Sequence, residues 1–93
     1  MAHALVSTVN LEGRSPEEAE KLLNERIIPM VKGLPGFDRG VWLRTVDGSK
    51  GMGIVVFDSE DNAASARQGM DAMRPAEAPE ITSAETYVVT GLA

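Results

Sequence analysis

Residues 38–57 read DRGVWLRTVDGSKGMGIVVF and contain the pattern of a β-hairpin. The runs at 38–46 and 52–57 are rich in β-branched and aromatic residues, which predicts two strands. Asp47-Gly48 between them is typical of the tight turn that joins antiparallel strands. The sequence therefore predicts an antiparallel pair in the middle of the chain.

The turn also predicts which residues of the two strands lie opposite each other. If Val46 lies opposite Ser49, then Trp42 lies opposite Gly53, where the missing side chain leaves room for the indole. A loop longer by one residue would reverse the faces. In the first register, one face carries a row of apolar side chains: Val41, Leu43, Met52, Ile54 and Val56. Such a row is too apolar to face water, so it predicts a partner, most simply a second copy of the chain.

The features of residues 16–32, which precede the hairpin, predict a helix. Ser15 is a suitable N-cap, Pro16 fits the first helical position, and Glu18 completes a capping box. Apolar residues follow at helical spacing: Ala19, Leu22, Leu23, Ile27, Met30 and Val31. Pro29 has no N–H to donate to the preceding turn, so a kink is expected in the last turn.

Three further elements complete the pattern: strands at 3–11 and 81–90 and a helix at 59–74. The order β-α-β-β-α-β is that of the ferredoxin-like α+β fold. In this fold two helices cover one face of a four-stranded antiparallel sheet. Strands 3–11 and 52–57 are expected at its centre, and strands 38–46 and 81–90 at its edges.

Composition excludes several classes of function. The 93 residues fit one domain, 1–93, since domains typically have about 100–150 residues. The net charge of -5 argues against a nucleic-acid protein, and the absence of cysteine removes disulfides and thiolate chemistry. No apolar run is long enough for a membrane span, and no secretory signal is expected, so the expected location is cytoplasmic. With a single His and no Cys, no metal site is expected.

Two stretches carry a resemblance to a known family: residues 27–37, IIPMVKGLPGF, and residues 53–66, GIVVFDSEDNAASA. With the element order, they resemble the dimeric α/β-barrel superfamily, and within it the antibiotic-biosynthesis-monooxygenase-like (ABM) domains. The resemblance implies a homodimer that pairs sheet to sheet and a pocket between sheet and helices. Small members of this family include cofactor-independent oxygenases acting on aromatic phenols and haem-degrading oxygenases, and related folds include stress-responsive and regulatory ligand-binding barrels.

The resemblance implies different residues for these two activities. Haem-degrading members have an Asn on the first strand, a Trp at the end of the third and a His on the second helix. The corresponding positions here hold Ser7, Phe57 and Arg67. None matches, so haem degradation is not expected and no cofactor is predicted.

His3 and Arg67 are the candidate catalytic residues. His3 is the only imidazole, the side chain best suited to proton transfer near neutral pH, and would serve as a base at the mouth of the pocket. Arg67 would point into the cleft and stabilise a phenolate. The alternatives are a terminal His without a role and a surface Arg paired with Glu60 or Asp71.

Substrate-binding candidates lie on the strands. Trp42 and Arg44 share a face and could hold a planar aromatic anion by stacking and charge. Ser7 could donate a hydrogen bond, and Phe57 could form an apolar wall. Each could equally be an ordinary structural residue. The same choice between pocket lining and core filling applies to four methionines: Met30, Met52, Met70 and Met73.

Three hypotheses follow for the function. The first is a cofactor-independent monooxygenase-like protein acting on a small aromatic, phenolic or quinone-like substrate. The second is a non-catalytic barrel that binds a small ligand or serves in a stress response. The third is a structural dimer whose cleft is filled by side chains. An open cleft with Arg67 pointing inward would favour a ligand, and a filled one would favour the third hypothesis.

Overall fold

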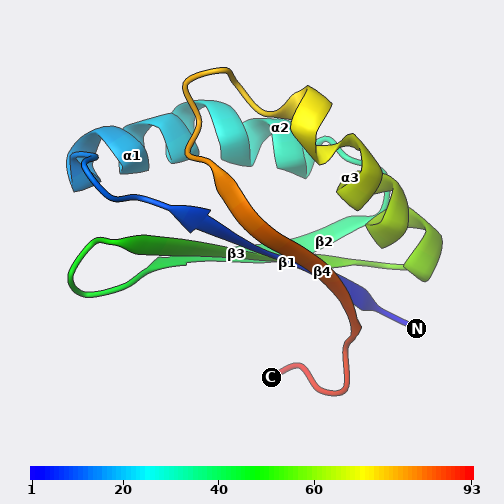
Figure 1. The fold of residues 1–93 in the computed structure, drawn as a ribbon. Helices are drawn as coiled ribbons and strands as arrows, with labels where there is room; N and C mark the ends of the chain where they lie inside the picture. Colours follow the sequence, from blue (N-terminus) through cyan, green and yellow to red (C-terminus); the bar gives the residue numbers. More distant parts are fainter.

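The computed structural model describes residues 1–93 and contains a four-stranded antiparallel sheet with helices on one face (Figure 1). The elements are β1 (His3–Asn10), α1 (Pro16–Leu22), η1 (Leu23–Ile27), α2 (Ile28–Lys32), β2 (Phe37–Arg44), β3 (Lys50–Phe57), α3 (Glu60–Met73) and β4 (Ile81–Val88). The strand order is β2-β3-β1-β4, so β1 and β3 are central and β2 and β4 are edges. The predicted ferredoxin-like α+β fold is confirmed.

The hairpin has the first of the two registers considered. Trp42 lies opposite Gly53 and Leu43 lies opposite Met52. The strand boundaries differ from the predicted ones by at most two residues: β2 and β3 begin earlier than predicted, and β2 and β4 end two residues earlier. Trp42 and Gly53 therefore face the helices, and the apolar row faces away from them.

Residues 16–32 form one continuous helical segment with the predicted bounds, but it contains a π-helical turn where a kink in the last turn was expected. Ser15 caps it as predicted, its Oγ accepting a hydrogen bond from the Glu18 N–H at 3.4 Å. The middle of the segment, η1, is a π-helical turn in which the Ile28 N–H donates to the Leu23 carbonyl, five residues back. Pro29 follows this turn directly. Its ring cannot donate and would collide with the carbonyl four residues earlier, so the helix widens before it.

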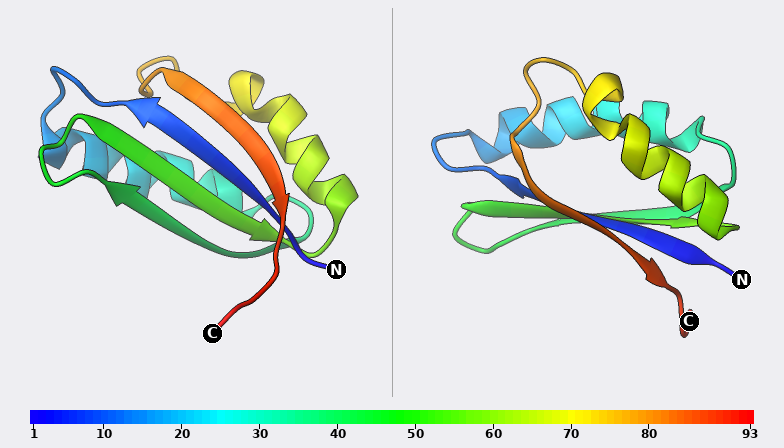
Figure 2. Two further views of the ribbon diagram at one scale, coloured as in Figure 1. Left: turned by 60° about the horizontal axis from the view of Figure 1, so that its bottom comes forward. Right: turned by 45° about the vertical axis from the view of Figure 1, so that its right-hand side comes forward.

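The core lies beneath α3. Ala63 and Ala66 of this helix are buried against the sheet, where they join Leu5, Val55 and Phe57 in one cluster. Small side chains let α3 approach the strands closely. In contrast, α1, η1 and α2 contain no buried residue. The segment from α1 to α2 and helix α3 lie on the same side of the sheet, behind it in the left view of Figure 2 and above it in the right view.

The opposite face of the sheet is open and largely apolar. Its exposed fractions are 46% for Val41, 51% for Leu43, 38% for Met52 and 50% for Tyr87. Val56 differs from these residues because it is buried. It lies between Arg39 of β2 and Ala4 of β1, the residues opposite it on the two neighbouring strands. None of the helices is both long and apolar enough to cross a membrane.

Candidate functional site

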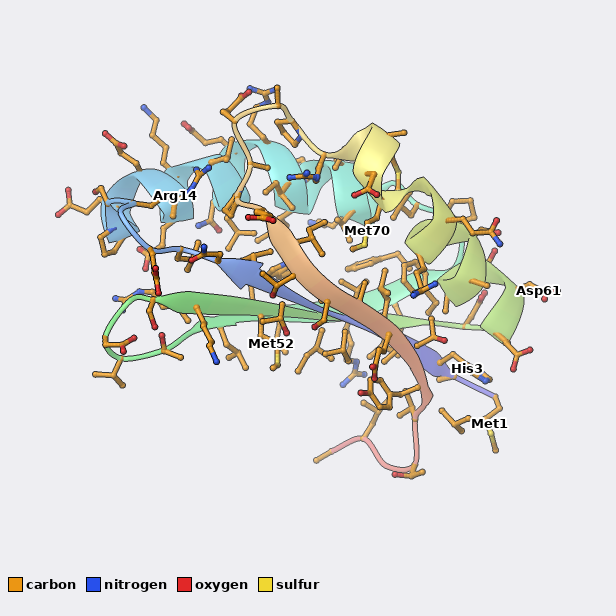
Figure 3. All side chains as sticks on the ribbon, in the orientation of Figure 1. Met1, His3, Arg14, Met52, Asp61 and Met70 are labelled. Carbon is orange, nitrogen blue, oxygen red and sulfur yellow. The ribbon has the colours of Figure 1, made fainter.

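A cavity of about 230 Å³ lies between the sheet and the helices. Of the 27 residues that line it, 19 are hydrophobic, so its walls suit an apolar ligand. In Figure 3, Met70 lies between α3 and the sheet, whereas Met52 projects from the opposite face. The cleft is therefore open, which disagrees with the hypothesis that side chains fill it.

The floor of the cavity is built around Trp42. Its indole lies between two glycines of the sheet: a Cβ on Gly40 would be 2.7 Å from Cη2, and a Cβ on Gly53 would be 2.9 Å from Nε1. Ser7 of β1 lies on the far side of Gly53, with its Oγ 3.3 Å from the same Cβ position. Two missing side chains thus make room for a large flat one. Ser7, Trp42 and Phe57, three of the predicted binding residues, all line the cavity.

The roof comes from both helical layers. Leu23 and Ile27 belong to the π-helical turn, and Met30 follows in α2. Met70 and Met73 come from α3. All five are apolar, and the three methionines have flexible side chains that adapt to ligands of irregular shape.

Three charged residues line the cavity, and only one of them was predicted. Arg44 Nε lies 3.3 Å from Glu20 Oε1, so these two form an ion pair that is partly exposed. Arg74 donates from Nη1 to the Pro79 carbonyl at 3.0 Å. Its buried Nε makes no hydrogen bond.

Helical spacing is the signal that could have found Glu20 and Arg74. Glu20 precedes Leu23 and Ile27 by three and seven residues, and Arg74 follows Met70 by four. Each therefore lies on the face of its helix that lines the cavity. Both were missed because charged residues were assumed to face solvent.

Neither predicted catalytic residue lines the cavity. Arg67 is exposed, and its Nε donates to the Ala84 carbonyl at 2.9 Å. The inward orientation expected for Arg67 is wrong, because Ala66 occupies the face of α3 that meets the sheet and the next residue points sideways to the edge strand β4. His3 lies at the end of β1, where its Nε2 is 3.4 Å from Glu60 Oε2 and its Nδ1 is 3.0 Å from the Met1 carbonyl oxygen.

A shallow groove runs along the outer edge of β2, next to the cavity. Glu20, Leu23 and Trp42 line both the cavity and this groove. The groove continues past Asn24 of η1 and Ile28 of α2. The Trp42 indole therefore lies between the inner cavity and a groove on the surface.

Ionisable groups with shifted pKa values lie outside the cavity. Tyr87 on the open face donates to Glu85 Oε2 at 2.6 Å, and this hydrogen bond together with the carboxylate charge raises the pKa of Tyr87 above its ordinary value. No group of three or more His, Asp or Glu is placed to hold a metal ion.

The chain has the fold of the antibiotic-biosynthesis-monooxygenase-like domains. One similar structure is a variant of SnoaB, a cofactor-independent oxygenase from Streptomyces nogalater, with a TM-score of 0.71 and 18% identity over 98% of this chain and 95% of that one. Another is the ActVA-Orf6 monooxygenase of Streptomyces coelicolor in complex with nanaomycin D (TM-score 0.62, 16% identity, 99% and 90% covered). A third is the haem degrader MhuD from Mycobacterium tuberculosis with two haems bound in its active site (TM-score 0.67, 16% identity, 100% and 99% covered). No protein-family model and no curated protein sequence matches the chain.

The cavity does not offer the usual ligands of haem iron. Haem is held by His, Cys or Tyr, or by Met together with His. The lining contains methionines but no His, Cys or Tyr, and the single His3 lies outside it. The residues present therefore fit a flat organic ligand better than haem.

Proposed function

We propose that the chain binds a small planar aromatic molecule of phenolic or quinone-like character in this cavity and acts on it as a cofactor-independent monooxygenase. The observation that carries the proposal is an apolar cavity whose floor is the Trp42 indole. An aromatic ring can stack on the indole while Phe57 and the methionines surround its edges. Arg44 lies at the cavity wall and is paired with Glu20 through Nε, and its guanidinium has further N–H groups that could donate to a phenolate oxygen.

In this reaction the substrate itself supplies the electrons. Loss of the phenolic proton gives an anion with carbanion character at a ring carbon, and O2 adds to that carbon. One oxygen atom stays on that carbon as a new carbonyl. The other leaves as water, which takes the phenolic proton and the hydrogen that the ring carbon loses, so a phenol becomes a quinone. The chain's residues bind and orient the ring, exclude bulk water and stabilise the anion. His3 and Arg67 are left out of this proposal because neither lines the cavity.

The second candidate is a protein that binds such a ligand without converting it. The side chains of the cavity favour it in one respect. Glu20 is the only carboxylate in the lining and it is already paired with Arg44, which leaves no free acid or base at the ring. A monooxygenase would then depend on a water molecule, held for example by Ser7, to accept the proton.

A thermal-shift screen with flat phenols, quinones, flavins and haem tests both candidates. A ligand at one hundred times its Kd stabilises the folded state by about 2.7 kcal/mol, which is a visible rise in Tm for a domain of this size. Stabilisation by a phenol with consumption of O2 supports the enzyme, and stabilisation without it supports the binder. Stabilisation by haem alone, or by no member of the panel, would contradict the proposal.

We also propose that two copies pair through their open sheet faces. Val41, Leu43 and Met52 form an exposed apolar row on this face, with Tyr87 across the sheet. Covering such a row removes apolar surface from water. Most of the residues that line the cavity lie on the other side of the sheet, and Leu43 and Met52 are the members of this row that also border it. Each copy would therefore keep its own ligand site.

A further inference from the structure

Two hydrogen-bond donors meet above Gly53 on the cavity floor. Trp42 Nε1 comes from β2 and Ser7 Oγ comes from β1, on either side of β3. They lie 2.9 Å and 3.3 Å from the single point where a Cβ on Gly53 would be. Gly53 is therefore the position that allows the two groups to approach the same space.

Both groups remain free to bind a ligand. The side-chain hydrogen bonds within the chain involve neither the Ser7 hydroxyl nor the Trp42 indole. An indole N–H can only donate, and a hydroxyl can donate as well. The surrounding walls are apolar, with Leu5 and Val55 as neighbours on the floor. A ligand that filled the cavity without accepting from these donors would exclude water from them and leave them without a hydrogen-bond partner, which costs free energy.

We propose that Ser7 and Trp42 form a donor pair that holds one carbonyl or phenolate oxygen of the bound ring. Such an oxygen has two lone pairs and can accept from both donors at once. The inference rests on the proposed function and adds a requirement to it: the ring must carry an acceptor oxygen at its buried edge. The same two donors would favour the charged phenolate over the phenol, because preorganised donors stabilise negative charge on oxygen.

The test uses two probes of the same shape, 1,4-naphthoquinone and naphthalene, with affinities measured by equilibrium dialysis. Ser7→Ala and Trp42→Phe should each weaken naphthoquinone binding by about fivefold, the typical effect of one lost hydrogen bond. Naphthalene accepts from neither donor, so the loss of a donor should not weaken its binding and can only relieve the cost of leaving that donor unpaired. Trp42→Phe keeps an aromatic wall, and Ser7→Thr, which retains the hydroxyl, should keep most of the affinity.

Ser83→Ala is the matched control. Ser83 lies on β4 opposite Thr8, and both side chains are on the open face of the sheet. Its substitution therefore removes a hydroxyl group without changing the cavity. The donor pair would be refuted if both variants weakened the binding of the two probes equally, or if they weakened the binding of neither probe. In either case the binding of the ring itself would still be supported. If the unmodified protein bound neither probe, the proposed function would fail as well.

Discussion

The Trp42 indole occupies the space that a side chain on Gly53 would need. A Cβ atom there would lie 2.9 Å from the indole Nε1 and 3.0 Å from Cδ1, both closer than van der Waals contact allows. Gly40 leaves the same kind of space at the other end of the ring. The cavity floor is flat because two glycines and one tryptophan share it, and several expected results follow from this arrangement and from its surroundings.

Gly53→Ala should destabilise the protein and weaken ligand binding together. The added methyl group must displace the indole or bend β3, at a cost of about 1–3 kcal/mol for overpacking a tight site. Urea denaturation measures the loss, and dialysis with naphthoquinone measures the binding. Gly91→Ala is the control, since nothing lies within 4 Å of its Cβ position. Equal stability of the two variants would contradict the packing described here.

Gly69→Ala should stabilise the protein. Gly69 lies inside α3, and the nearest atom to its Cβ position is Met73 Cε at 3.4 Å, the end of a flexible side chain. Alanine gains about 0.5–1 kcal/mol over glycine in a helix interior. The urea concentration at the midpoint of unfolding should therefore rise, and the dependence of the unfolding free energy on urea concentration (the m-value) should stay the same. A fall would mean that Met73 cannot move aside.

Asp47 should make the stability depend on pH below about pH 4. Its Oδ1 accepts from the Ser49 N–H at 2.9 Å, from Thr45 Oγ1 at 2.7 Å and from Ser49 Oγ at 2.8 Å. These bonds lower the pKa of Asp47 from 3.8 to about 2. Because the folded-state pKa is lowered, the stabilisation is fully present above the unfolded pKa and is lost as pH falls through the folded one.

The comparison for this effect is Asp47→Asn, which does not titrate. The difference in unfolding free energy between the wild-type protein and this variant should shrink between about pH 4 and pH 2. An NMR titration of the Asp47 carboxyl group should give a midpoint near 2. A midpoint at the ordinary value of 3.8 would show that the turn does not hold these bonds in solution.

Leu43→Glu should dissociate the proposed dimer. The change places a charge in the middle of the exposed apolar row of β2, where pairing with a second copy would bury it. Light scattering coupled to size-exclusion chromatography should report a dimer for the wild-type protein and a monomer for the variant. Val46→Glu adds the same charge in the fully exposed hairpin turn and should leave the dimer intact. A monomeric wild-type protein would refute the pairing.

His3→Ala and Arg67→Ala should leave naphthoquinone affinity unchanged. Neither residue lines the cavity, and Arg67 already donates to the Ala84 carbonyl on the edge strand. The same dialysis experiment measures both variants. A loss of binding in either would mean that the side chain turns into the cavity when a ligand is present.

Much of the fold could be predicted because its signals are local. Asp47-Gly48 sets the hairpin turn, and the Trp42–Gly53 pair follows from the register that this turn allows. The π-helical turn could not be read from periodicity, because one added residue in a helical turn leaves the apolar spacing almost intact.

The site was harder to predict because it depends on where helices meet strands. Ser7, Trp42, Arg44 and Phe57 line the cavity, and alternation along the strand is what predicts that Trp42 and Arg44 share a face. Their role in binding stays a prediction. Arg67 was misplaced because its neighbour Ala66 takes the face of α3 that meets the sheet, and Arg67 points sideways to the Ala84 carbonyl of β4. That carbonyl becomes its partner only when α3 and β4 lie side by side.

The two helical segments have different structural roles, and this difference affects which substitutions the protein can tolerate. The buried cluster lies under α3, and the segment from α1 to α2 contributes roof side chains but no buried residue. Substitutions at Leu23, Ile27 or Met30 can therefore reshape the ligand space while the cluster that keeps the chain folded stays intact. Substitutions in this segment should change the shape of the cavity more readily than they change the stability of the fold. A library of variants confined to this segment should therefore retain a high proportion of folded proteins.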